Sequence, residues 1–178
     1  MDPLLESLTD QQASELVHRL YDRGGEVRLT VLEEARKVLQ DIDAHQIADD
    51  VFFGLDIIDV ETLWDQSGPG RHGYVSPDDQ ALHMIEDEIE PYIQQLRNYK
   101  QLDMEAEAIA CLQGILLGLY RFAHESQSEF KDWAVDIPQE LFAIIQNKWG
   151  KRFDNPSHKE KINEFCQEIC PNWTNLLY

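Results

Sequence analysis

Residues 104–124 read MEAEAIACLQGILLGLYRFAH, a stretch in which most positions after Glu107 are apolar or small. Large apolar side chains leave almost no polar face, and a helix that is apolar all round is buried. Small residues recur at every fourth position, just over one helical turn, and so line one slowly drifting stripe: Ala106, Ala110, Gly114 and Gly118. The stretch is therefore predicted to be the buried central helix of an all-α domain, with a stripe that a neighbouring backbone can approach closely.

Amphipathic helices are predicted on both sides of this segment, each from its start signal. The expected starts are Thr9 with Gln12, Thr30 with Glu33, residue 44, Ser76 with Pro77, Asp103 for the central helix, Pro138, and Ser157 with Glu160. A short piece is expected at 126–133, and Pro91 should kink or break the helix that contains it. Strand signals are nearly absent. The fold class is all-α, a compact bundle of about six to eight helices around 104–124.

The length of 178 residues fits one domain, 1–178, with a Gly/Pro-rich loop at 66–76 and a short C-terminal tail at 171–178. The apolar run 109–120 is shorter than the roughly 20 residues that a membrane span needs. Acidic residues near the first methionine are atypical of a secretory signal, so a cytoplasmic location is expected. The three cysteines have no disulfide or zinc spacing, which favours free, buried thiols.

Charge is the extreme property of the chain, with 34 acidic residues against 15 Lys and Arg and a net charge of −19. Residues 38–96 hold 14 of these acids and one Arg, whereas 148–161 has a net charge of +3. Direct nucleic-acid binding is disfavoured, because phosphate contacts need a basic surface. Two interpretations stay open: the acids serve solubility or tolerance to salt, or they attract a basic protein partner.

The loop around GPGRHG, residues 68–73, is the best candidate for a recognition surface. It matches G-x-G-x-x-G, but the dinucleotide fingerprint needs a preceding strand, and acids open the next helix. A nucleotide cofactor is therefore rejected, and no other cofactor is predicted. A plain connector is the alternative to a recognition role. The candidate binding residues are Trp64, Asp65, Arg71, His72 and Tyr74.

Motifs for catalysis or metal binding are incomplete. Glu15 and His18 have the Glu-x-x-His spacing of di-iron bundles, but the motif occurs once where such sites need it twice. The acidic runs fail as calcium loops, since Gln46 or Val51 stands where a ligand or the glycine must be. No catalytic residue and no metal ligand is predicted.

The first hypothesis is therefore a non-enzymatic, acidic α-helical protein that acts by protein–protein interaction with a basic partner, without contact to a membrane. A metal-dependent enzyme is the alternative, with a carboxylate and histidine site inside the bundle. It would use Glu15, His18, and Asp49 or Glu86. A third hypothesis is a homo-oligomer that pairs part of its apolar surface.

Overall fold

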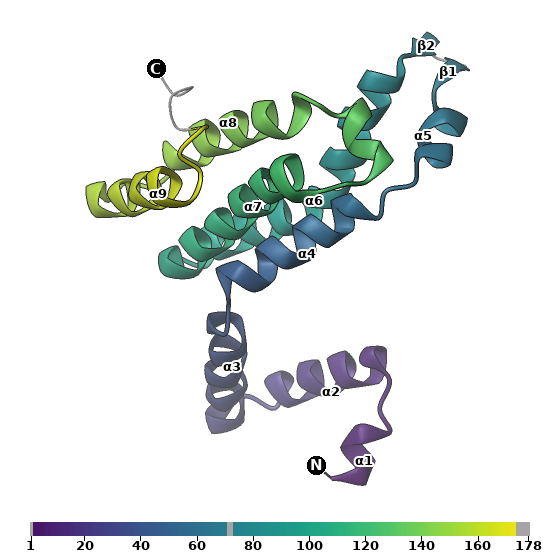
Figure 1. Cartoon of the computed structure of the whole chain (residues 1–178). Helices are drawn as coiled ribbons and strands as arrows, with labels where there is room; N and C mark the ends of the chain where they lie inside the picture. The colour runs from purple at the N-terminus through teal and green to yellow at the C-terminus, as the bar shows by residue number, and fades with distance from the viewer. Residues whose placement is uncertain (1, 71–72, 174–178) are drawn as a thin grey trace. The chain divides into compact units, whose positions relative to one another are not determined.

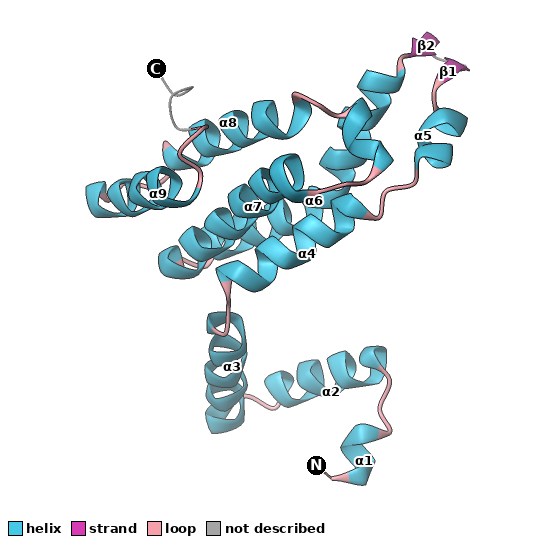
Figure 2. Cartoon of the chain, viewed as in Figure 1, coloured by secondary structure: helices cyan, strands magenta, loops and turns pink. Residues whose placement is uncertain are grey.

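The structure, a computed structural model, describes residues 2–70 and 73–173 (Figure 1). The fold is all-α as predicted, and helices make up most of the chain (Figure 2). The chain forms two compact units, Met1–Asp41 (unit 1) and Ile42–Tyr178 (unit 2). The expectation of one domain over 1–178 stays a prediction.

Unit 1 consists of three helices, α1 (Pro3–Glu6), α2 (Asp10–Asp22) and α3 (Gly25–Gln40). The capping box at the start of α2 is confirmed, since the Thr9 hydroxyl accepts from the Gln12 amide and the Gln12 side chain accepts from the Thr9 amide. The predicted helix start at Thr30 is wrong. Gly24 precedes α3 with a φ of 71°, which glycine adopts without strain, and the helix begins six residues earlier than predicted. Inside it, the Thr30 hydroxyl donates to the Glu26 carbonyl at 3.0 Å.

Unit 2 holds the core, which is built around the predicted central helix, α7 (Glu105–Glu125). Helix α7 contacts α4 (Ala44–Asp56), α6 (Pro77–Gln101), α8 (Ile137–Gly150) and α9 (Pro156–Ile169). The unit also contains α5 (Val60–Gln66), the strands β1 (Gly68–Gly70) and β2 (Gly73–Val75), and the 3-10 helix η1 (Glu129–Trp133). The central position of 104–124 is confirmed.

The small stripe of α7 contacts the backbone of α4. A Cβ atom built at Gly114 would lie 2.6 Å from the Ile47 Cβ and 2.7 Å from the Ala44 carbonyl oxygen. At Gly118 it would lie 2.6 Å from the Val51 Cβ. The N-terminal half of the stripe is more open, since Ala106 is exposed and Ala110 half-buried. Close helix packing therefore uses the two glycines only.

Helix boundaries in unit 2 follow some predictions and correct others. The Ser76 hydroxyl caps α6 by accepting from the Asp79 amide at 3.1 Å, as expected. Of the kink or break predicted at Pro91, the break is wrong, because α6 continues through this exposed proline to Gln101, and the kink stays a prediction. Asp103 does not cap α7. It has a φ of 55°, in the left-handed region that a few Asp residues adopt in turns, and the buried Met104 precedes the helix.

Two further differences concern chain segments outside the core. Helix α9 begins at Pro156 rather than Ser157, because the Asn155 side chain caps it by accepting from the Ser157 amide at 3.0 Å. The Gly-rich loop includes an antiparallel pair of three-residue strands that sequence reasoning did not expect. In the C-terminal tail, Trp173 is buried with its ring 5.1 Å from that of Phe142. Tyr178 lies outside the described residues.

Helix α7 is also long and apolar enough, by length and composition, to cross a membrane. It is the sole helix of this kind in the described part of the chain, and 61% of its most apolar 18-residue window is buried by the rest of the protein. Burial of this degree is typical of a helix in a protein core.

The three cysteines are free and buried, as the spacing suggested. Burial raises the pKa of the Cys111, Cys166 and Cys170 thiols from 9.0 to about 12. Since the thiolate is the reactive form, we expect no rapid reaction of the folded protein with a disulfide reagent at pH 8, and reaction of all three thiols after unfolding. Rapid labelling of the native chain would contradict this burial.

The same thiols are expected to lower the free energy of unfolding in alkali. The folded state keeps its protons between pH 9 and 12, whereas the unfolded state loses them, so the free energy of unfolding decreases as pH rises through this range. The contribution is fully present below pH 9. Replacing Cys111 with serine is expected to reduce this alkaline slope, measured by urea denaturation at several pH values.

Candidate protein-binding surface

Several acids of the 38–96 region stabilise helix starts. The Asp43 carboxylate accepts from the His45 amide at 2.8 Å and caps α4. The Asp59 carboxylate caps α5, and hydrogen bonds from the amides of Glu61 and Thr62 lower its pKa. Each of these carboxylates stabilises the positive N-terminal end of its own helix.

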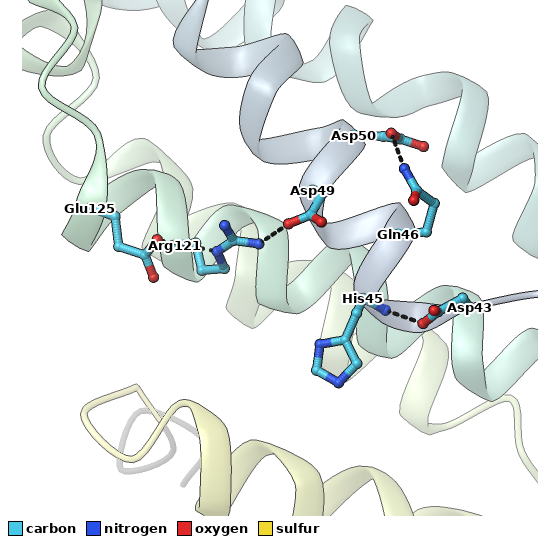
Figure 3. Close-up of polar contacts among 7 residues, drawn as sticks. All are labelled: Asp43, His45, Gln46, Asp49, Asp50, Arg121 and Glu125. Atoms are coloured by element: carbon cyan, nitrogen blue, oxygen red, sulfur yellow. Dashed lines mark hydrogen bonds and ion pairs between the residues drawn. The ribbon is translucent and has the colours of Figure 1, made fainter.

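Other acids join α4 to its neighbours (Figure 3). Arg121 of α7 forms an ion pair with Asp49 of α4 and a second one with Glu125 at 3.2 Å, while its guanidinium lies 5.0 Å from the Phe52 ring centre. The hydrogen bond to Asp49 raises the pKa of Arg121. At the far end of α4, Asp56 accepts from the Ser126 hydroxyl at 2.6 Å. These contacts hold α4 against α7 and neutralise part of the acidic run.

A second group of acids makes no such contacts. In the described part of 42–96, five exposed carboxylates form neither a hydrogen bond nor an ion pair. All five lie on α5 and α6: Glu61, Asp65, Asp78, Glu86 and Asp87. The available negative charge of this region is therefore gathered on two consecutive helices.

Three of the five residues predicted to bind a partner lie in the described part of the chain, on α5 and β2. Trp64 and Asp65 occupy the end of α5, and Tyr74 lies on β2 with 71% of its surface exposed. Trp64 is 49% exposed, and its ring meets the edge of Trp133 with centroids 4.7 Å apart. Arg71 and His72 lie outside the described residues. In the described part of the chain, the rings of Trp64 and Tyr74 make no contact with each other, so the two side chains do not form one aromatic cluster.

Sequence reasoning missed a groove between α6 and α8. It has a volume of about 440 Å³ and an apolar floor of buried side chains, Ile89, Ile93, Leu141, Ile145 and Trp149, and the exposed Ile144 also lines it. Five charged side chains of α6 and α8 also line it: Glu86, Asp87, Glu90, Arg97 and Lys148. Arg97 and Glu90 form an ion pair at 2.6 Å. The groove therefore combines apolar surface with free carboxylates.

One signal in the sequence points to this groove. Ile144 lies outside the buried stripe of α8, which consists of Leu141, Phe142, Ile145 and Trp149, and is 58% exposed. An apolar side chain beside a complete core stripe indicates a second apolar contact, but the pattern cannot identify the helix opposite.

Two acids of the alternative hypothesis, Glu15 and Asp49, are each paired with an arginine. The Glu15 carboxylate forms an ion pair with Arg19 at 2.5 Å on the surface of α2, and Asp49 forms one with Arg121. In residues 2–70 and 73–173, no group of three or more His, Cys, Asp or Glu side chains is arranged to hold a metal ion.

Comparison with known proteins gives no family. No protein-family model matches the chain, and neither a curated protein nor a solved structure matches it at a significant level.

Proposed function

We propose that the protein is a non-enzymatic binding protein, and that its α6–α8 groove binds a basic, amphipathic helix of a protein partner. The observation that supports this proposal is an apolar floor beside free carboxylates in one open groove of about 440 Å³. Helix-in-groove recognition needs both parts, because apolar anchors supply affinity and charges supply specificity.

The charges along the groove favour one direction for the bound helix. Glu86 and Asp87 lie at one end of the α6 rim, and Arg97 lies about three turns later. A helix has a positive N-terminus and a negative C-terminus. The partner helix is therefore expected to run parallel to α6, with its N-terminus and its basic side chains near Glu86 and Asp87.

Residues on α5 and β2 would extend the contact. Asp65 adds a further free carboxylate, and Trp64 and Tyr74 expose aromatic surface of the type enriched in binding interfaces. Arg71 and His72 complete the set that we propose for specific contacts. The −19 net charge would speed the approach of a basic partner, and a cytoplasmic location is part of the same proposal.

The proposal is tested with two triple variants that change net charge equally. Glu86→Gln, Asp87→Asn and Glu90→Gln remove the carboxylates of the groove, whereas the control removes exposed carboxylates of α9, Glu160→Gln, Glu164→Gln and Glu168→Gln. Each tagged chain is used to capture proteins from native lysate at low and high salt, and the bound proteins are identified.

The wild-type and control chains are expected to retain the same basic proteins at low salt, and the groove variant to lose them. High salt should release them from every chain, because salt screens exposed charges. Equal capture by the groove variant, or capture that ignores salt, would overturn the proposal.

A further inference from the structure

A pocket between the last turn of α8 and the first half of α9 has a positive lining in an acidic protein. It has a volume of about 240 Å³. Two lysines, three amide side chains and one isoleucine line it: Gln146, Asn147, Lys151, Lys159, Ile162 and Asn163. Among the described residues, no carboxylate lines this pocket, although the chain has a net charge of −19. Its charge therefore favours an anion.

The two lysines of the pocket have no acidic partner in the described part of the chain. Three other cations of unit 2 each form an ion pair: Arg97, Lys100 and Arg121. The side chains of Lys151 and Lys159 form neither an ion pair nor a hydrogen bond with any described residue. The first turn of α9 contains no acidic residue, so the positive end of this helix adds to the charge of Lys159. Both ammonium groups are therefore free to bind an anion.

One buried amide of the pocket lacks a hydrogen-bond partner. Gln146 is 5% exposed, and its side-chain oxygen is buried without a donor in the described part of the chain. Buried polar atoms in folded proteins are nearly always satisfied by protein, water or ligand, because an unpartnered one destabilises the fold. Since Gln146 lines the pocket, a hydroxyl group bound there would supply the missing donor.

We propose that this pocket binds a small phosphate monoester that carries a free hydroxyl group. A phosphate monoester has nearly two negative charges at pH 7 and three strong acceptor oxygens. These suit two ammonium groups, Lys151 and Lys159, together with the amide donors of Asn147 and Asn163. A phosphate dianion has no hydrogen to donate, so the hydroxyl group of the same ligand is needed for the Gln146 oxygen.

The size of the pocket limits the ligand to a few carbon atoms. Its volume of about 240 Å³ lies below the range of roughly 300 to 1,000 Å³ that is usual for ligand pockets. Gly150 also lines it and adds open space, since no atom lies within 4 Å of a Cβ built there. The buried Ile162 offers apolar contact to a short carbon chain. Glycerol phosphate has these properties and is the probe for the test.

The proposal does not depend on the function proposed for the α6–α8 groove. The residues that line the groove and those that line this pocket are different, and the groove carries three carboxylates. A failure of one proposal therefore leaves the other standing.

The test follows nuclear magnetic resonance spectra of the isotope-labelled full chain while glycerol phosphate, inorganic phosphate or glycerol is added. Lys151→Gln with Lys159→Gln removes both ammonium groups of the pocket at exposed positions, so the fold is retained. Lys148→Gln with Lys161→Gln is the matched control, because it changes net charge equally at lysines outside this pocket. Gln146→Met removes the unpartnered oxygen and keeps a side chain of similar length.

The wild-type and control chains are expected to bind glycerol phosphate equally, with shifted signals from the side-chain amides of Gln146, Asn147 and Asn163. The K151Q/K159Q chain should bind it at least roughly tenfold more weakly, because it loses charge-assisted hydrogen bonds. Inorganic phosphate should bind the wild-type chain roughly tenfold more weakly than glycerol phosphate, since it leaves Gln146 unpartnered. The Q146M chain is expected to bind the two phosphates equally.

Three results would contradict the proposal. One is a wild-type chain whose pocket amides do not shift at millimolar glycerol phosphate, and another is equal binding by K151Q/K159Q. The third is equal binding of glycerol phosphate and inorganic phosphate to the wild-type chain, because water rather than a ligand hydroxyl then satisfies Gln146.

Discussion

Replacing Gly118 with alanine is expected to destabilise unit 2 by about 3 kcal/mol, near the upper end of the range for overpacked cores. The new Cβ would lie 2.6 Å from the Val51 Cβ and 3.0 Å from the Ala48 carbonyl oxygen, both on α4. Alanine favours a helix over glycine by about 1 kcal/mol, but backbone atoms of α4 cannot move aside cheaply, so the clash is larger.

Gly150→Ala is the control for this substitution. No atom lies within 4 Å of a Cβ at Gly150, and its backbone is helical, so alanine is expected to leave stability unchanged or raise it by up to about 1 kcal/mol. Urea denaturation followed by far-ultraviolet circular dichroism measures both changes. A Gly118→Ala chain as stable as Gly150→Ala would show that α4 and α7 are not in close contact.

Replacing Leu116 with alanine is expected to destabilise unit 2 by about 3 to 5 kcal/mol. Leu116 is 0% exposed in the middle of α7, and its removal leaves a cavity that surrounding helices fill only in part. Leu102→Ala serves as the control, because Leu102 is 49% exposed and the same chemical change there should cost less than about 1 kcal/mol. The free energies of unfolding in urea measure this difference. Equal losses at the two positions would contradict a buried α7.

The central helix could be predicted because its evidence is local. Apolar side chains all round 104–124 imply burial, and the spacing of Gly114 and Gly118 implies close approach of a neighbour. The caps Thr9 and Ser76 were identified for the same reason, since each acts on an amide three residues away. The start of α3 was missed because Thr30 and Glu33 resemble a capping box, while the glycines before Val27 can equally end one helix and precede the next.

The candidate site depended on contacts that sequence patterns do not contain. The stripes of α2 and α3 indicate apolar faces, but no pattern says whether their own chain covers them. Likewise, the groove arises because Ile89 of α6 and Ile144 of α8, 55 residues apart, line one surface. The acidic run is uniform in the sequence, but its members differ in the structure. Asp49 forms an ion pair with Arg121 of α7, and Asp56 accepts a hydrogen bond from Ser126, the C-cap residue of α7. Glu86 and Asp87 form no ion pair with any described residue.

The most direct test of helix binding by the α6–α8 groove is a titration of the full chain with a synthetic helical peptide. This peptide carries leucine on one face and lysine on the other. Binding is expected to weaken steeply between about 50 and 200 mM salt. It should also be lost in the groove variant E86Q/D87N/E90Q, and be kept in the α9 variant E160Q/E164Q/E168Q. Binding of equal strength to both variants, or to a peptide with glutamate in place of lysine, would contradict recognition of a basic helix by the α6–α8 groove.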